Sequence, residues 1–324
     1  MKNILKILIA FIIIYFLINY NIINIVELKK VFNNFNYIFY ILILMFITIP
    51  LGTFRWWMLL DSEKYNISYT NAYLLYSTGL FFNIFMPGGA GGDITKGYYL
   101  FKYVEKKQRT LAIFTILVDR AIGFHALLFV ISSLGFMIAD KIFYNQDLYK
   151  LFYIILIFMI TSIPVIFVII NFSGSIVKFL ENIKNNFAVI FLIKIFQSLQ
   201  IYKNRKLVIF KCWTISIVNH ICLLSCFYIT SISLNIDVFS YFEAAFVAGA
   251  SLITNVIPLT PGGFGIGESS FNYLSKFLYE NENIAFGSIF FITFRVLFNI
   301  ICLSGAISFI VISKPGNSYK KLNN

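Results

Sequence analysis

Long apolar stretches separated by short polar ones dominate this chain. Helical runs that cross the hydrocarbon core of a membrane need about 20 residues. Runs of that kind cover residues 4–26, 37–58, 109–139, 148–171, 207–234 and 283–312. Two more apolar stretches, 70–87 and 241–257, lead into segments rich in proline and glycine. The pattern predicts an all-α polytopic membrane protein of about eight hydrophobic helices, with two broken, re-entrant hairpins.

The two breaks share a motif that ends on an acidic residue. The first reads PGGAGGD and ends at Asp93, and the second reads PGGFGIGE and ends at Glu268. Arg120 stands as far along the chain after Asp93 as Arg295 stands after Glu268. Broken helices at corresponding places in two halves point to the central binding site of a transporter. We therefore expect a translocator of a lipid or solute.

The repeat suggests a division of the chain. We expect one transmembrane domain, 1–324, whose related halves are 37–139 and 207–312. The segment between them, 172–206, is interpreted as a cytoplasmic amphipathic linker, because apolar residues alternate with lysines in its helical stretch 183–202.

Composition supports the membrane assignment. Hydrophobic residues make up 59% of the chain and charged residues 12%, which is too little polar surface for a soluble globule. The formal net charge is +12. We attribute it to cytoplasmic loops beside anionic lipid rather than to a nucleic-acid partner, since no nucleic-acid-binding pattern accompanies it.

The basic residues predict an orientation, because cytoplasmic loops carry the excess of lysine and arginine. With both termini in the cytoplasm, most of the basic residues lie inside. The outer side then holds only Lys29, Lys30, Lys141, Lys150 and Lys276. This arrangement requires that segment 70–101 opens from the cytoplasm and segment 241–279 from outside, so that the two hairpins are inverted in a cell membrane.

Glycines and prolines at the breaks have both a functional and a structural interpretation. Glycine lets the backbone approach a ligand, and helices that begin after the breaks present amides to an anion. The alternative is that the glycines serve tight helix packing. Asn83 and Asn255 precede the breaks and can bond to backbone groups that the prolines leave unpaired. The break residues concerned are Gly92, Gly262, Gly263, Gly265, Pro87, Pro258 and Pro261.

Arginines inside apolar runs need a partner, because a central arginine costs about 2.5 to 3.5 kcal/mol on insertion scales. For Arg120 and Arg295 that partner is an internal acid (Asp93, Asp119 or Glu268) or a phosphate received by the guanidinium group. Asp119 projects about 100° away from Arg120 around a helix, so it is not simply the partner of that residue.

The acids at the breaks and a further arginine each have two interpretations. Asp93 and Glu268 either cap helices, which the sequence favours, or act as protonatable gates. Arg55 stands beside two tryptophans and is interpreted as an interfacial anchor, with contact to a lipid headgroup as the alternative.

No metal, cofactor or enzyme signature accompanies these residues. His220 is spaced poorly with its neighbouring cysteines for a metal site, and no fourth ligand is evident. The chain has no nucleotide-binding loop and no soluble catalytic domain. The cysteines are expected to be buried free thiols. They are Cys212, Cys222, Cys226 and Cys302.

The stretches RWWMLL, FFNIFMPGGAGGDITKGYYL, LVDRAIGFHALL and IPLTPGGFGIGESSF resemble the flippase-like family of the lysylphosphatidylglycerol synthase transmembrane region, over about 37–312. The first motif departs from relatives that often carry a residue other than glycine before the Gly-Asp pair. The matching positions are Asn83, Pro87, Gly92, Asp93, Asp119, Arg120, Pro258, Pro261, Gly262, Gly263, Gly265 and Glu268.

The resemblance implies movement of a phosphate-headed lipid, aminoacylated or polyisoprenyl, between leaflets. Bifunctional relatives add a soluble aminoacyl-transfer domain, for which this sequence carries no signal, so we do not expect lysyl transfer. One alternative is a membrane transferase that uses Asp93 or Glu268 as a base on a lipid-linked phosphate. Another is a non-transporting partner of a separate lipid-modifying enzyme. Membrane lipids are the expected ligands, and the sequence carries no signal for an oligomeric state.

Overall fold

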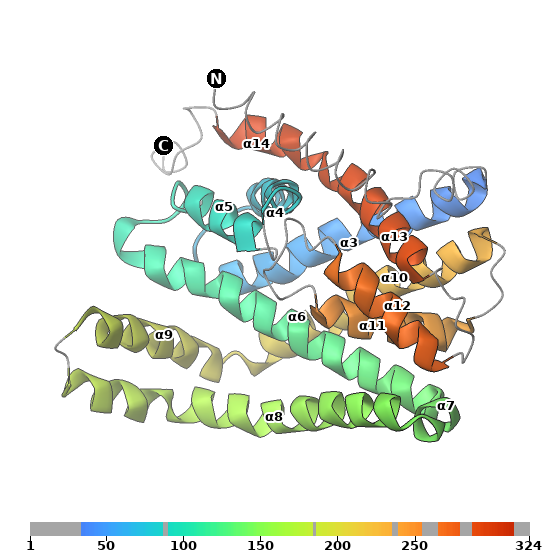
Figure 1. Cartoon of the computed structure of the whole chain (residues 1–324). Helices are drawn as coiled ribbons and strands as arrows, with labels where there is room; N and C mark the ends of the chain where they lie inside the picture. Colours follow the sequence, from blue (N-terminus) through green and yellow to red (C-terminus); the bar gives the residue numbers. More distant parts are fainter. Residues whose placement is uncertain are drawn as a thin grey trace.

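The computed structural model describes residues 34–86, 90–183, 186–234, 239–254, 265–278 and 287–313, and its regular structure there is helical (Figure 1). A 3₁₀ turn, Lys106–Gln108, precedes α6. The α-helices are α3 (Phe35–Ser62), α4 (Tyr69–Asn83), α5 (Ala90–Leu100), α6 (Arg109–Met137), α7 (Ala139–Tyr144), α8 (Gln146–Glu181), α9 (Phe187–Lys203), α10 (Lys206–Ser233), α11 (Tyr241–Thr254), α12 (Ile266–Leu278), α13 (Gly287–Cys302) and α14 (Gly305–Ser313).

Five helical segments of the described residues are long and apolar enough to cross a membrane. They are Phe35–Ser62, Lys106–Met137, Gln146–Glu181, Lys206–Ser233 and Ile289–Ser313. The chain is an all-α polytopic membrane protein, as its sequence predicts. The first apolar run, 4–26, lies outside the described residues.

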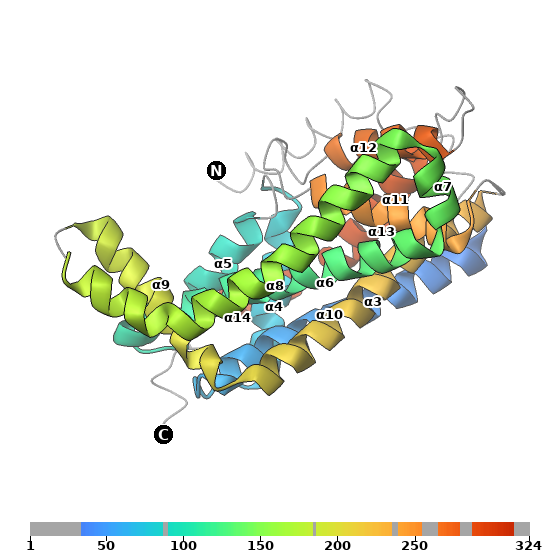
Figure 2. The same cartoon turned by 90° about the horizontal axis from the view of Figure 1, so that it is seen from below.

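The largest apolar core forms between α3, α6, α8 and the helices α10 to α13. Helices α3 and α10 lie side by side along much of their length (Figures 1 and 2). Hydroxyl groups on the buried faces bond to carbonyls one turn earlier, as Thr230 does to Cys226 at 2.8 Å. That bond satisfies a polar group that water does not reach.

The two segments with broken helices fold as helical hairpins. In the first, α4 returns as α5, and the backbones meet where a Cβ on Gly92 would overlap the carbonyl oxygen of Gly79. In the second, α11 returns as α12, and the Ser270 hydroxyl donates to the Thr254 hydroxyl at 3.1 Å. Short side chains at these contacts let each pair of helices pack closely.

Helix α8 is longer than its apolar run predicts. It continues past residue 171 to Glu181, which gives a length of about 54 Å at 1.5 Å per residue for its 36 residues. A hydrocarbon core of about 30 Å does not cover such a helix. Its far end and α9, which packs against it, project beyond the other helices (Figure 2). The predicted linker 172–206 thus contains the end of α8 and all of α9.

The close approach of α4 and α5 predicts the effect of Gly92→Ala. The added methyl group should force the hairpin apart and lower the free energy of unfolding by about 1 to 3 kcal/mol. Gly97→Ala on the same helix is the control, because its Cβ would meet only Ile113 and Ile116 side chains, at 3.6 Å or more. Thermal unfolding of the purified protein in detergent checks both, and equal melting temperatures would contradict the packing argument.

Candidate functional site

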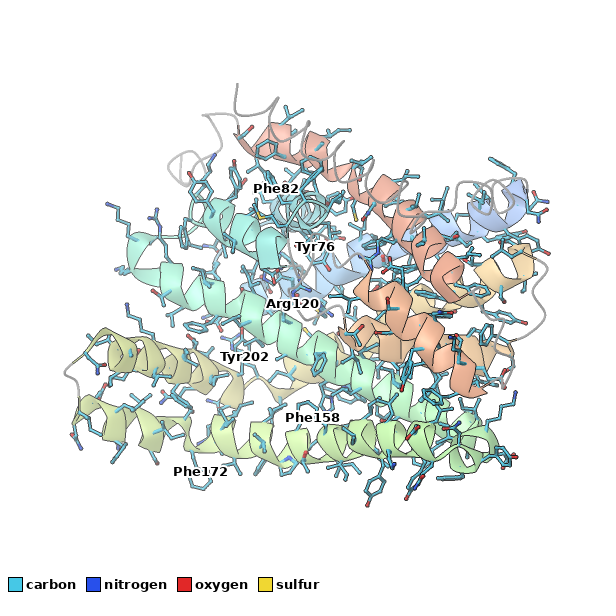
Figure 3. The ribbon with its side chains drawn as sticks, viewed as in Figure 1. Tyr76, Phe82, Arg120, Phe158, Phe172 and Tyr202 are labelled. Carbon is cyan, nitrogen blue, oxygen red and sulfur yellow. The ribbon has the colours of Figure 1, made fainter. Side chains whose placement is uncertain are left out.

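The first break ends in an ion pair between Asp93, in the first turn of α5, and Arg120, in the middle of α6. Arg120 Nε donates to Asp93 Oδ2 at 2.7 Å, and Nη2 donates to Oδ1 at 3.2 Å. Arg120 lies near the middle of the molecule (Figure 3). Its side chain is 53% exposed and that of Asp93 is 24% exposed. We call this partly exposed pair the open pair.

The second break ends in the corresponding pair, Glu268 of α12 with Arg295 of α13. Arg295 Nε lies 2.8 Å from Glu268 Oε1, and Nη2 donates to Oε2 at 3.2 Å. Both pairs join residues 27 positions apart. The second is sealed, however, because the Arg295 and Glu268 side chains are only 7% and 4% exposed.

Glu268 also caps the helix that carries it. Its Oε2 accepts a hydrogen bond from the backbone N–H of Gly265 at 2.8 Å. Gly265 precedes the first residue of α12 and has a φ of +87°, in the left-handed region that favours glycine. A glutamate that reaches back three residues to the start of its helix satisfies an N–H that has no partner within the helix. Glu268 is thus a cap and an ion-pair partner at once.

A third ion pair, which sequence reasoning missed, lies beside the first. Arg55 of α3 donates from Nε and Nη2 to the two carboxylate oxygens of Asp119, at 2.7 and 2.9 Å. Its Nη1 donates to Ser216 of α10 at 3.0 Å. The group fits because Gly123 has no side chain: a Cβ there would lie 2.8 Å from Nη1.

The interpretation of Arg55 as an interfacial anchor is wrong, because the residue is only 7% exposed and lies between helices. A signal was available in the sequence. Asp119 sits inside an apolar run and points away from Arg120, so it required a cation from another helix, and Arg55 is an arginine in such a helix.

Lys96 of α5 is a second residue that the sequence did not single out. It is 3% exposed, and its Nζ lies 3.6 Å from Asp93 Oδ1. The ammonium group also lies over the Trp56 ring, 4.5 Å from the centroid, and 5.2 Å from that of Tyr76. We call the group around it the first-half charge cluster. Its members are Arg55, Asp93, Lys96, Asp119 and Arg120.

The remaining predicted site residues divide into two groups. Asn83 accepts a hydrogen bond from the Gly92 N–H at 2.7 Å, so it binds backbone at the break, as expected. The others lie outside the described residues: Pro87, Asn255, Pro258, Pro261, Gly262 and Gly263.

The sequence matches a family model over most of its length. Residues 3–302 match the family model described as the lysylphosphatidylglycerol synthase TM region. The chain belongs to this family. That range includes both hairpins and all three ion pairs. No curated protein and no solved structure matches the chain in the two other comparisons. The chain is thus a multi-pass membrane protein of a family related to lipid modification or flipping.

In this member of the lysylphosphatidylglycerol synthase TM region family, the buried Arg55–Asp119 pair predicts a non-additive effect. Arg55→Met or Asp119→Leu alone leaves a buried charge and should cost about 3 to 5 kcal/mol of folding free energy. The double variant should recover most of that loss, because neither charge remains. Thermal unfolding of all three variants in detergent measures the coupling.

The exposed pair of Glu105 and Lys107 supplies the control, since its side chains are 42% and 84% exposed. Removing Lys107 should change stability by less than about 1 kcal/mol. Additive losses for Arg55 and Asp119 would show that the two groups do not depend on one another.

Proposed function

We propose that this protein translocates a phosphate-headed lipid between the leaflets of a cell membrane, with Arg120 as the headgroup contact. The observation that carries the proposal is the contrast between two ion pairs at equal spacing. One is open and contains Arg120, 53% exposed, and the other is closed and contains Arg295, 7% exposed.

The chemistry of the open pair fits a phosphate. A guanidinium fork binds carboxylate and phosphate oxygens with the same two parallel N–H groups. A headgroup can therefore replace the carboxylate of Asp93, to which Arg120 now donates both bonds. When the lipid leaves, Asp93 returns as the internal partner, so the arginine is never unpaired in a region that penalises charge.

The buried pair has a different part in this proposal. Glu268 ties the start of α12 to Arg295 of α13 and holds the second hairpin against the bundle. The acyl chains of the lipid would remain in the membrane while its headgroup passes the polar cluster. We further propose that both termini lie in the cytoplasm and that the hairpins are re-entrant from opposite sides, which suits alternating access.

Arg120→Gln tests the role of the open pair. In phosphatidylcholine vesicles that contain fluorescent phosphatidylglycerol, the variant should move the labelled lipid at least about tenfold more slowly, because a charge-assisted contact is lost. Quenching of the outer-leaflet label measures the rate. Lys107→Gln removes one charge from an exposed site and should leave the rate unchanged.

Arg295→Gln should reduce transport together with the melting temperature, since it breaks a buried pair. Wild-type transport by Arg120→Gln would refute the headgroup contact. Mass spectrometry of the vesicle lipids should show no new species, and a covalently altered lipid would indicate a transferase instead.

A further inference from the structure

At matching positions, the first half has charged residues where the second half has phenylalanines. Helices α3 to α6 correspond in order to α10 to α13, and Asp93 and Arg120 correspond to Glu268 and Arg295. Lys96 stands one turn after Asp93, where the second half has Phe271 after Glu268. Asp119 directly precedes Arg120, where Phe294 precedes Arg295. Arg55 stands as far before α4 as Phe227 stands before α11.

The contacts support this correspondence. Arg55 binds Asp119 in the first half, and Phe227 stacks on Phe294 in the second, with ring centroids 4.4 Å apart. Phe227 also stacks on Phe271, at 5.7 Å. All three phenylalanines are buried. The positions of Arg55, Lys96 and Asp119 in the first half are thus occupied by phenylalanine in the second. We call these three phenylalanines the phenylalanine plug.

This difference gives the halves different charge balances. Around the open pair, the first-half charge cluster contains three cations and two carboxylates, whereas the matching positions of the second half hold only Arg295 and Glu268 as charged residues. Lys96 carries the surplus. A buried cation without a matching anion is costly, so the cluster as it stands favours an incoming negative charge.

Lys96 also has an incomplete set of partners. Its Nζ lies 3.6 Å from the nearest carboxylate oxygen, too far for a good hydrogen bond, and its other contacts are the faces of Trp56 and Tyr76. Among the described residues, this ammonium group makes no hydrogen bond. Three N–H donors are therefore held beside Asp93, at the acid that Arg120 would release.

We infer that Lys96 is a second cationic contact for the anionic group that Arg120 receives, and that this binding site exists in the first half only. The inference rests on the proposed function and narrows it. One surplus cation matches a headgroup with one net negative charge, such as a phosphodiester, and disfavours a zwitterionic headgroup whose own cation would meet Lys96. The second half, plugged by phenylalanine, would hold its hairpin in place without binding a headgroup.

Calorimetric titration of the detergent-purified full chain with dioctanoyl phosphatidylglycerol tests this inference, and dioctanoyl phosphatidylcholine serves as the zwitterionic comparison. The wild type should bind one phosphatidylglycerol per chain in preference to phosphatidylcholine. Lys96→Met should weaken phosphatidylglycerol binding at least about tenfold and leave phosphatidylcholine binding unchanged. Lys96→Arg should retain most of the affinity, and Lys107→Gln, which removes the same charge from an exposed site, should retain all of it.

Melting temperatures separate a ligand contact from a structural one. Lys96→Met should melt at or above the wild-type temperature, because it removes a buried cation with no hydrogen-bond acceptor. A lowered melting temperature with equal losses for both lipids would assign Lys96 to structure and overturn the inference. So would unchanged phosphatidylglycerol binding by Lys96→Met, or two equivalent sites per chain.

The same titration distinguishes this inference from the function on which it rests. If Arg120→Gln loses phosphatidylglycerol binding and Lys96→Met keeps it, only the role of Lys96 fails. If the wild type binds neither lipid and Arg120→Gln behaves like it, the proposed headgroup contact itself fails.

Discussion

The arrangement of this protein depends on the cost of placing a guanidinium group inside a membrane protein. Each intramembrane arginine is met by an acid on a different helix, which neutralises the charge and joins the two helices. Together the three contacts connect α3, α5 and α6 in one half, and α12 and α13 in the other. The pairs are Arg55 with Asp119, Arg120 with Asp93, and Arg295 with Glu268.

Pairing of this kind requires that each acid faces its arginine, and the hairpins place the acids in the first turns of α5 and α12, beside α6 and α13. A helix that ends within the bundle exposes backbone groups that must be satisfied by protein. Asn83 meets this need for Gly92, and Glu268 meets it for Gly265. The residues that repair the backbone at each break therefore stand within or beside the ion pair, so the break and the charge form one structural unit.

The sequence predicted the parts of this architecture that depend on local pattern. The apolar runs gave the membrane helices, and the repeated spacing of acid and arginine corresponded to real contacts, because each pair joins neighbouring helices of one half. The pairing of Arg55 with Asp119 was not predicted. The two residues are 64 positions apart in the sequence, and nothing in the local sequence specifies which faces of α3 and α6 meet.

The burial of Lys96 was likewise not predicted from the local sequence. From its neighbours in the sequence, the positive-inside pattern assigns Lys96 to the end of a cytoplasmic segment. Its burial follows from Trp56 and Tyr76, which come from two other helices. The length of α8 was likewise underestimated, since polar residues after position 171 end the apolar run without ending the helix.

The proposed repeat has unequal halves, and this difference has a mechanical consequence. If both ion pairs were equally open, a headgroup would find two similar sites and could remain bound between them. In the proposed mechanism, the first-half charge cluster is the single place that stabilises an anion, while the sealed Arg295–Glu268 pair fixes the other hairpin. Under the proposed function, movement is confined to the half that binds the headgroup, where Asp93 and a phosphate compete for the guanidinium group of Arg120. In this proposal, the three phenylalanines exclude charge from the second half, and Lys96 attracts an anion to the first.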